Sequence, residues 1–325
     1  MSVRETDVPS AASLAVLTED APADRTVTEP EGKGKAPTIG LGGRIAAGWL
    51  LLVVVLSVLA PILPIDEPTA RGAGSELGLF TEGHILGTDT SQRDVFSRLI
   101  FGARSSLIVS VGAILVGLVI GGTLGLISGF RRGRIDTALS SVFDILLAFP
   151  QLVLALSLVA FLRPPSASSG SGDAQVDTSG GLTTIQILII ALGIVAIPLL
   201  ARITRATTLS WSQREFVLAA RAQGAKNLRI MVREVLPNVM PAMFSIALLS
   251  IAIAIIAEGG LSLLGVGVQA PTPSWGNMIT DNRAVRSAPL NALFSPIAAL
   301  FLTVMALNYL GDAVRQKYDV RESAL

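Results

Sequence analysis

Few side chains in this 325-residue sequence belong to the types that perform catalysis or bind metals. There is no cysteine, which excludes disulfides, thiolate metal sites, iron–sulfur clusters and cysteine nucleophiles. The single histidine, His84, is interpreted as structural, because one imidazole is too few for a histidine-built metal site. No G-x-x-x-x-G-K-[ST] phosphate-binding loop occurs. We therefore predict no catalytic residue, no metal and no cofactor in this chain.

Two carboxylates stand at the ends of long apolar runs. Glu258 follows one run, and ionisable groups at membrane depth are costly and often functional. It could line a pathway through the membrane, or else it anchors the loop that follows it. Asp144 precedes another run, and we expect it to pair with the basic group Arg131, Arg132 and Arg134 near a helix N-terminus.

The composition indicates an integral membrane protein. Hydrophobic residues make up 51% of the chain and charged residues 15%, whereas a soluble domain carries about 25% charged residues. A disordered chain would be polar and highly charged, so that class is excluded as well. The net charge of +1 gives no sign of a nucleic-acid partner.

Six windows without Asp, Glu, Lys or Arg are each long enough to cross a bilayer as a helix, which needs about 20 residues. We predict six transmembrane helices and an all-α membrane fold, with windows at residues 45–65, 105–130, 145–162, 178–201, 235–257 and 287–311. A seventh window, residues 259–280, contains several glycines and two prolines. It is predicted to be a helix end followed by an ordered loop.

Small residues recur in the second window and predict close helix packing. They are Gly112, Gly117, Gly121, Gly122 and Gly125.

Basic residues predict the sidedness of the chain. With both termini inside, the inner segments hold 18 of the 25 Lys and Arg residues and the outer segments hold 7, as the positive-inside rule requires. Residues 1–43 are then a disordered cytoplasmic tail, residues 44–312 a membrane domain and residues 313–325 a cytoplasmic tail. Residues 66–104 form an extracytoplasmic segment, and residues 202–237 form the longest cytoplasmic loop.

That loop contains a helix–glycine–helix pattern. Residues 214–224 are good helix formers, Gly224 interrupts the pattern, and a second helical stretch covers residues 227–235. Pro237 is expected at the start of the fifth span, where proline is tolerated. The loop either docks another protein through its small side chains or lies as a basic amphipathic segment on anionic headgroups.

The motif residues of this loop resemble the EAA loop of binding-protein-dependent ABC import permeases. They are Leu218-Ala219-Ala220-Arg221-Ala222-Gln223-Gly224 and, nine residues later, Glu234-Val235-Leu236-Pro237. Leu218 stands where the family usually has an acid. Two further stretches are similar to the oligopeptide and dipeptide branch: His84-Ile85-Leu86-Gly87-Thr88-Asp89 with Arg93, Asp94 and Arg98, and the run from Leu261 to Gly276.

The resemblance, which covers residues 44–321, implies the C-type permease subunit of a peptide importer with type I architecture. It implies a second homologous permease, two cytoplasmic ATPase subunits that bind ATP and Mg, and an extracytoplasmic peptide-binding protein. It also implies the bacterial cytoplasmic membrane and an alternating-access mechanism. The ATPase-coupling residues would be Leu218, Ala219, Ala220, Arg221, Ala222, Gly224, Leu236 and Pro237.

Two other functions remain open. A permease of the same family for nickel, glutathione or another small solute would look much alike. An ion-coupled secondary transporter would be expected to show repeats and buried acids at mid-membrane, and the window centres have no charge. An intramembrane enzyme would need a catalytic set within the spans, and one histidine, no cysteine and no buried acid pair leave it few residues to build one.

Overall fold

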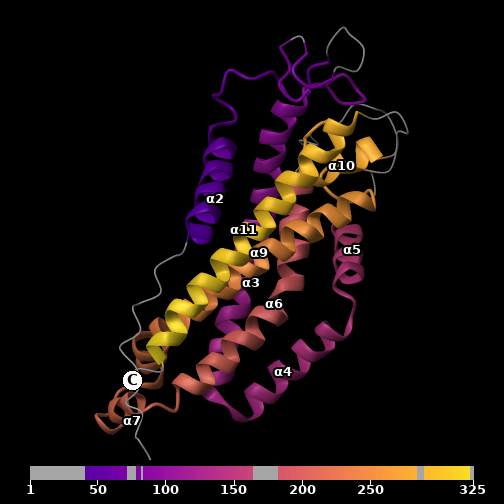
Figure 1. The fold of residues 1–325 in the computed structure, drawn as a ribbon. Helices are drawn as coiled ribbons and strands as arrows, with labels where there is room; N and C mark the ends of the chain where they lie inside the picture. The colour runs from indigo at the N-terminus through magenta and orange to yellow at the C-terminus, as the bar shows by residue number, and fades with distance from the viewer. Residues whose placement is uncertain (1–40, 72–77, 82, 164–181, 284–288, 323–325) are drawn as a thin grey trace, which may run out of the picture. The chain divides into compact units, whose positions relative to one another are not determined.

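The computed structural model describes residues 41–71, 78–81, 83–163, 182–283 and 289–322, with side chains up to residue 316. The regular elements of this described part are helices (Figure 1). Five segments are long and apolar enough to cross a membrane, and a bent pair makes six when it is counted as one span, as predicted. The helices are α2 Leu41–Leu59, α3 Val95–Arg131, α4 Gly133–Ala148, α5 Gln151–Leu162, α6 Thr184–Trp211, α7 Glu215–Ala222, α8 Asn227–Ile230, α9 Leu236–Leu263, α10 Trp275–Arg283 and α11 Leu290–Glu322.

The tails differ from their predicted bounds. α2 begins at Leu41, so residues 41–43 of the predicted 1–43 tail are helical, and residues 1–40 lie outside the described part. α11 continues through residues 313–322 of the predicted second tail. Likewise α3 already begins at Val95 and α6 ends only at Trp211. Both helices therefore extend well into segments that the sequence assigned to loops at residues 66–104 and 202–237.

The predicted third span, residues 145–162, is not a continuous helix. α4 and α5 meet at an angle of 93°. Pro150 lies in the break, and Phe149 before it is extended, with φ −82° and ψ 139°. Proline has no N–H to donate to the preceding turn, and it also disfavours helical angles in the residue before it. The uncharged window correctly identified an apolar segment, but Pro150 within it interrupts the helix and places the bend.

The fifth span starts earlier than predicted, because α8, a π-helical turn at Met231–Val235 and α9 follow one another without a gap. In the π turn the Leu236 N–H donates to the Met231 carbonyl, five residues back. Pro237 is the second residue of α9, near its start as expected, but the continuous helical run already begins at Asn227. The wider turn precedes a residue that cannot donate a hydrogen bond, which is a usual adjustment around proline in membrane helices.

Helices α3 and α6 pack closely along a stripe of glycines spaced four residues apart. A Cβ on Gly121 would lie 2.5 Å from the Ile197 carbonyl oxygen, and one on Gly125 would lie 2.3 Å from that of Ala201. On Gly129 the same atom would lie 2.6 Å from the Arg205 carbonyl oxygen. The predicted role of the glycines in packing is confirmed here, because only hydrogen atoms fit between the two backbones.

Residues 259–280 contain the end of α9 and an ordered loop, as predicted, and also the start of α10, a helix that was not predicted. α9 ends at Leu263, and Gly265 follows with φ +78°. Asn277 in α10 fastens the loop, because its Nδ2 donates to the carbonyl oxygens of Val268 at 3.2 Å and Thr272 at 2.8 Å. Its Oδ1 accepts the Ser274 N–H at 2.9 Å. These bonds satisfy backbone groups that no helix satisfies.

Large apolar side chains remain exposed on the long helices. Leu51 is 66% exposed, Val58 68% and Phe301 61%. A soluble protein rarely leaves such extended apolar surface in water, whereas hydrocarbon chains cover it at no cost. The exposed residues therefore belong to a multi-pass membrane protein.

Candidate functional site

The short helices α7 and α8 form a unit at one end of the long helices, and α10 lies toward the other end (Figure 1). Gly224 lies in the turn between α7 and α8 and has φ +79°, a left-handed conformation that favours glycine. The Gly224 N–H donates to the Arg221 carbonyl at 2.9 Å, and the Ala225 N–H donates to the Ala220 carbonyl at 3.1 Å. This pair of bonds is a Schellman motif, which ends α7 and turns the chain into α8. The predicted helix–glycine–helix pattern is confirmed.

An apolar cluster holds the α7–α8 unit against the long helices. Val217, Ile230 and Val235 are fully buried and pack with Leu126 and Phe130 at the end of α3. Ala220 and Leu236 are half-buried against the same cluster. These two predicted coupling residues therefore face their own chain and fix the unit in place.

The opposite side of α7 is open. Leu218 is 56% exposed, and Phe216 of α7 and Leu228 of α8 are 37% and 67% exposed. The remaining predicted coupling residues are also exposed: Ala219, Arg221, Ala222, Gly224 and Pro237. A Cβ on Gly224 would meet no atom of this chain within 4 Å. The structure thus leaves six of the eight predicted residues available to another molecule.

A cavity of about 730 Å³ opens between α7 and the end of α3. We call it the arginine cavity, after three of its lining residues; the lining consists of Phe130, Arg131, Arg132, Ser212, Gln213, Leu218, Arg221 and Asn227. Sequence reasoning identified Leu218 and Arg221 but missed the contribution of α3. The run Arg131, Arg132 and Arg134 is visible in the sequence, but we expected it to pair with Asp144 and gave it no part in the α7–α8 unit.

Comparison with known proteins identifies the family. The family model "Binding-protein-dependent transport system inner membrane component" matches residues 121–322. The chain belongs to this family. It is therefore a membrane permease component of ABC transporters, a type of subunit that has no catalytic function of its own.

Relatives match the permease over most of its length. It is 36% identical over 267 residues to a dipeptide transport system permease protein of Alkalihalophilus pseudofirmus, covering 82% of this chain and 81% of the relative. It is 37% identical over 278 residues to a glutathione transport system permease protein of Pectobacterium atrosepticum, covering 85% and 86%. A di/tripeptide permease of Pseudomonas aeruginosa is 35% identical over 285 residues, covering 86% and 87%.

A solved structure shares the fold. The permease superposes on an inward-facing MetNI methionine ABC transporter with a TM-score of 0.52 and 18% identity, covering 67% of this chain and 95% of that one. A second crystal form gives a TM-score of 0.54 at 19% identity, covering 68% and 96%. At this identity the likeness establishes the fold alone.

Glu258 of the permease lies in a buried network near the end of α9. Its side chain is fully buried and accepts hydrogen bonds from three serine hydroxyls: Ser106 of α3 at 3.1 Å, Ser262 at 3.0 Å and Ser274 at 2.9 Å. The Ser106 hydroxyl also accepts the N–H of Trp275, the first residue of α10. In this conformation Glu258 lines no open space, and its contacts are those of the anchoring alternative.

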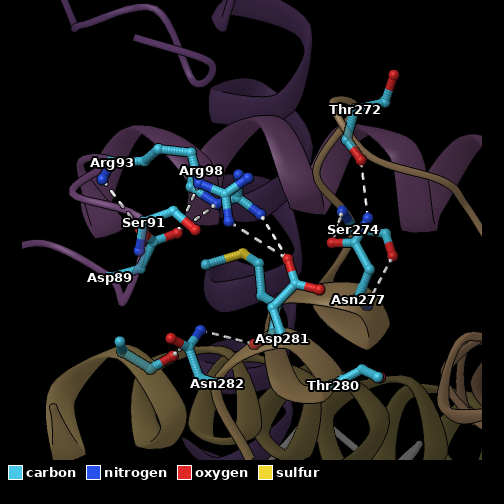
Figure 2. A network of polar contacts seen from close by, with 12 residues as sticks. Asp89, Ser91, Arg93, Arg98, Thr272, Ser274, Asn277, Thr280, Asp281 and Asn282 are labelled. Atoms are coloured by element: carbon cyan, nitrogen blue, oxygen red, sulfur yellow. Dashed lines mark hydrogen bonds and ion pairs between the residues drawn. The ribbon is translucent and has the colours of Figure 1, made fainter. Parts of the chain in front are cut away.

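A second polar cluster ties α3 to α10. Figure 2 shows Arg93 and Arg98 directed at Asp89 and Asp281. The Arg93 Nε lies 2.8 Å from an Asp89 oxygen, and the Arg98 Nε lies 3.4 Å from the same atom. Both guanidinium groups also reach Asp281, at 3.3 and 3.5 Å. Asp89, Arg93 and Arg98 of the sequence motif thus form an ionic clamp with Asp281 of α10, which the sequence analysis did not identify.

Asp66, His84 and Asp94 are the residues of the described part that could hold a metal ion, with ligand atoms within 4.8 Å of one another. The His84 Nδ1 lies 2.8 Å from Asp94 Oδ1 and 3.9 Å from Asp66 Oδ2. Asp94 caps α3, because its other oxygen accepts the Ser97 N–H at 2.6 Å. A hydrogen-bonded pair at a helix cap accounts for this geometry and agrees with the structural interpretation of His84.

The arginines near α4 pair differently from the sequence prediction. Asp144 pairs with Arg202 of α6, not with the arginines at the end of α3. Asp136 accepts two hydrogen bonds from Arg205, at 2.5 and 2.7 Å, and one from the Ser128 hydroxyl at 2.6 Å. Both carboxylates of α4 are therefore paired with arginines of α6, against which α4 packs.

Proposed function

We propose that the permease is the transmembrane subunit of an ATP-driven importer of dipeptides and oligopeptides. The observation that carries this proposal is its similarity, over more than four-fifths of both chains, to permeases that are named for dipeptides and for di/tripeptides. Peptides share the same backbone donors and acceptors, so a weakly selective path can pass many sequences.

The α7–α8 unit is proposed to couple the permease to its ATPase. Leu218, Ala219 and Gly224 would make close contact with one of two ATPase subunits, which bind ATP and Mg themselves. Two features support this role. The unit exposes apolar and basic side chains, a combination typical of protein interfaces, and Val217 packs it tightly against α3. A movement of α7 would therefore be passed to the spans without being absorbed by a flexible loop.

The assembly would contain a second homologous permease that completes the pathway and a binding protein that delivers the peptide. The positive-inside rule favours a cytoplasmic α7 end and cytoplasmic termini. The α10 end, with the ionic clamp of Asp89, Arg93, Arg98 and Asp281, would then face the binding protein. Alternating access follows if ATP binding and substrate delivery bias the same two conformations from opposite ends.

Glu258 has a defined place in this proposal. A pathway role would require its three serine contacts to open during the transport cycle. Until they open, the network holds α10 against α3 and α9. If the hydrogen bonds from the three serines broke during the cycle, the Glu258 carboxylate would become accessible to a peptide amino terminus.

Glutathione is the second candidate substrate, because a glutathione permease matches this chain as well as the dipeptide permeases do. Glutathione is itself a small peptide, and nickel or another small solute would need the same kind of subunit. Uptake of labelled dipeptides and of labelled glutathione, measured separately in cells with and without the permease, distinguishes these cases.

The assembly is tested by copurification. A tagged permease in mild detergent should retain a second permease and ATPase subunits, identified by mass spectrometry. Recovery of a stable homo-oligomer without them would overturn the importer assignment and favour a secondary transporter.

The coupling site is tested at Gly224 with two substitutions of equal size. Gly224→Asp should abolish uptake, because a charge enters the contact, while Gly224→Asn should retain most of it. Asp and Asn both tolerate the left-handed conformation, so the backbone strain is matched. Membrane insertion of both variants is verified by blotting. Equal uptake by the two variants would show that Gly224 does not lie in the contact with the ATPase.

A further inference from the structure

The arginine cavity has the composition of a site for a negatively charged group. Three guanidinium groups line it, from Arg131, Arg132 and Arg221, together with polar side chains of Ser212, Gln213 and Asn227. No carboxylate belongs to the lining. Three like charges facing one space repel one another unless an anion or water separates them.

Two arginines of the cavity, Arg132 and Arg221, make contacts that leave their charge unbalanced. The Arg132 Nη2 donates to the Ser212 hydroxyl at 3.3 Å. The Arg221 guanidinium stacks over the Phe130 ring at 5.7 Å from its centroid. Among the described residues, no acidic group lies within ion-pair distance of Arg131, Arg132 or Arg221. A guanidinium group held in this way loses less side-chain freedom when it binds an anion.

The acids that the sequence offered to these arginines are engaged elsewhere. Asp136 is bound to Arg205 and to the Ser128 hydroxyl, and Asp144 is bound to Arg202. Neither α4 carboxylate therefore neutralises the cavity. The described part of the chain therefore places three arginines at the cavity and provides no acidic side chain to pair with them.

The surroundings of the cavity point to a protein as the source of the anion. Leu218 lies on the cavity wall and is 56% exposed, and Leu228 and Phe216 of the same α7–α8 unit are 67% and 37% exposed. Exposed leucine and phenylalanine beside arginine are typical of the centre of a protein interface. α7 has only eight residues, so it cannot itself span a bilayer.

We propose that the arginine cavity receives the carboxylate of an Asp or Glu side chain of the ATPase subunit, next to an apolar patch of that subunit that covers Leu218. This inference rests on the proposed function and specifies its partner. A carboxylate fits because guanidinium groups bind it through paired, charge-assisted hydrogen bonds. The partner surface must then be acidic where it meets Arg221 and apolar where it meets Leu218.

The test captures the carboxylate chemically in the assembled complex. Arg221→Lys places a primary amine in the cavity, and a carbodiimide joins an amine to a carboxylate without a spacer. We expect a cross-linked peptide that contains position 221 and an acidic residue of the copurified ATPase. Arg134→Lys is the matched control, because Arg134 is exposed in the first turn of α4, two residues after Arg132, but does not line the cavity.

A binding measurement supplies the second arm. Arg131→Gln with Arg132→Gln should weaken binding of the copurified ATPase to the permease in nanodiscs by about tenfold or more. Added salt should weaken the wild type more than this variant, since the variant has lost the ionic contact. Arg134→Gln should behave like the wild type in both respects.

The outcomes separate this inference from the proposed function. If no ATPase copurifies with the wild type, the proposed function fails and the inference fails with it. If the ATPase binds but no peptide is captured through position 221 and the double variant binds normally, the inference alone is wrong. If the double variant instead loses bound anionic phospholipid while ATPase binding is unchanged, the cavity is a lipid site and the inference is again wrong.

Discussion

Gly125 is the position where an added methyl group should reveal the packing of α3 against α6. In Gly125→Ala the new Cβ would lie 2.3 Å from the Ala201 carbonyl oxygen and 2.9 Å from the Thr204 Cβ. The first distance is about 1 Å short of ordinary contact. The obstructing atom is backbone, so it cannot rotate away, and the two helices must separate.

The expected cost follows from two opposing effects. Overpacking costs about 1–3 kcal/mol, and the upper part of this range applies because separation also loosens the contacts at Gly121 and Gly129. Replacing glycine by alanine in a helix returns up to about 1 kcal/mol. We therefore expect a net loss of about 1–2 kcal/mol in the free energy of unfolding.

Gly122→Ala is the matched control on the same helix. Its Cβ would meet only the Met243 Cε, the end of a flexible side chain, at 2.5 Å. The methionine can move, so stability should be unchanged or slightly higher.

Thermal unfolding of the purified permease, followed by tryptophan fluorescence at one fixed scan rate, measures both variants. Gly125→Ala should unfold several degrees below the wild type, and Gly122→Ala should not. If the two variants unfold at the same temperature, or in the reverse order, the glycine stripe does not set the approach of α3 to α6.

Three further predictions concern the polar contacts and the tail. Glu258→Ala should lower the free energy of unfolding by about 1–3 kcal/mol, because three buried hydroxyls lose their acceptor. Glu258→Gln should cost less stability, and it should slow transport if the pathway role holds. Equal losses of stability for the two variants in the same thermal assay would contradict the network. Asp136→Asn should destabilise the permease by about 1–3 kcal/mol, because it breaks a paired, partly buried contact, whereas Asp144→Asn, in an exposed pair, should be close to neutral. Deletion of residues 2–38 should leave copurification and uptake unchanged, and a loss of assembly would make this segment an interaction element.

Local features of the sequence were sufficient where short-range physics decides the structure. The helix–glycine–helix unit was predictable because Gly224 supplies a left-handed conformation between two stretches of good helix formers. The six apolar windows identified the membrane helices because the bilayer thickness fixes their minimum length. The bend at Pro150 was also predictable from the sequence, because proline has no backbone N–H to donate to a helical hydrogen bond. A search for uncharged windows does not detect such a bend.

Partners across the fold were not predictable. Asp144 was expected to pair with arginines close to it in the chain, and it pairs with Arg202 because α4 crosses α6. Ala220 was expected to face another protein, and it packs inward because the rotation of α7 is set by Val217 entering the apolar cluster at the end of α3. Residue spacing gives the periodicity of a helix, but neighbouring elements decide which face is covered.

The sequence by itself determined the membrane location, the family and the position of the α7–α8 unit. Each of these depends on composition or on residues close together in the chain. The tertiary structure alone decided that Arg131 and Arg132 meet Arg221 in one cavity, and that Glu258 is enclosed by serines from separate segments. These sites are formed by contacts between residues up to 169 positions apart. Such contacts exist only after the helices have packed, because packing brings together side chains whose separation along the chain carries no information about their distance in space.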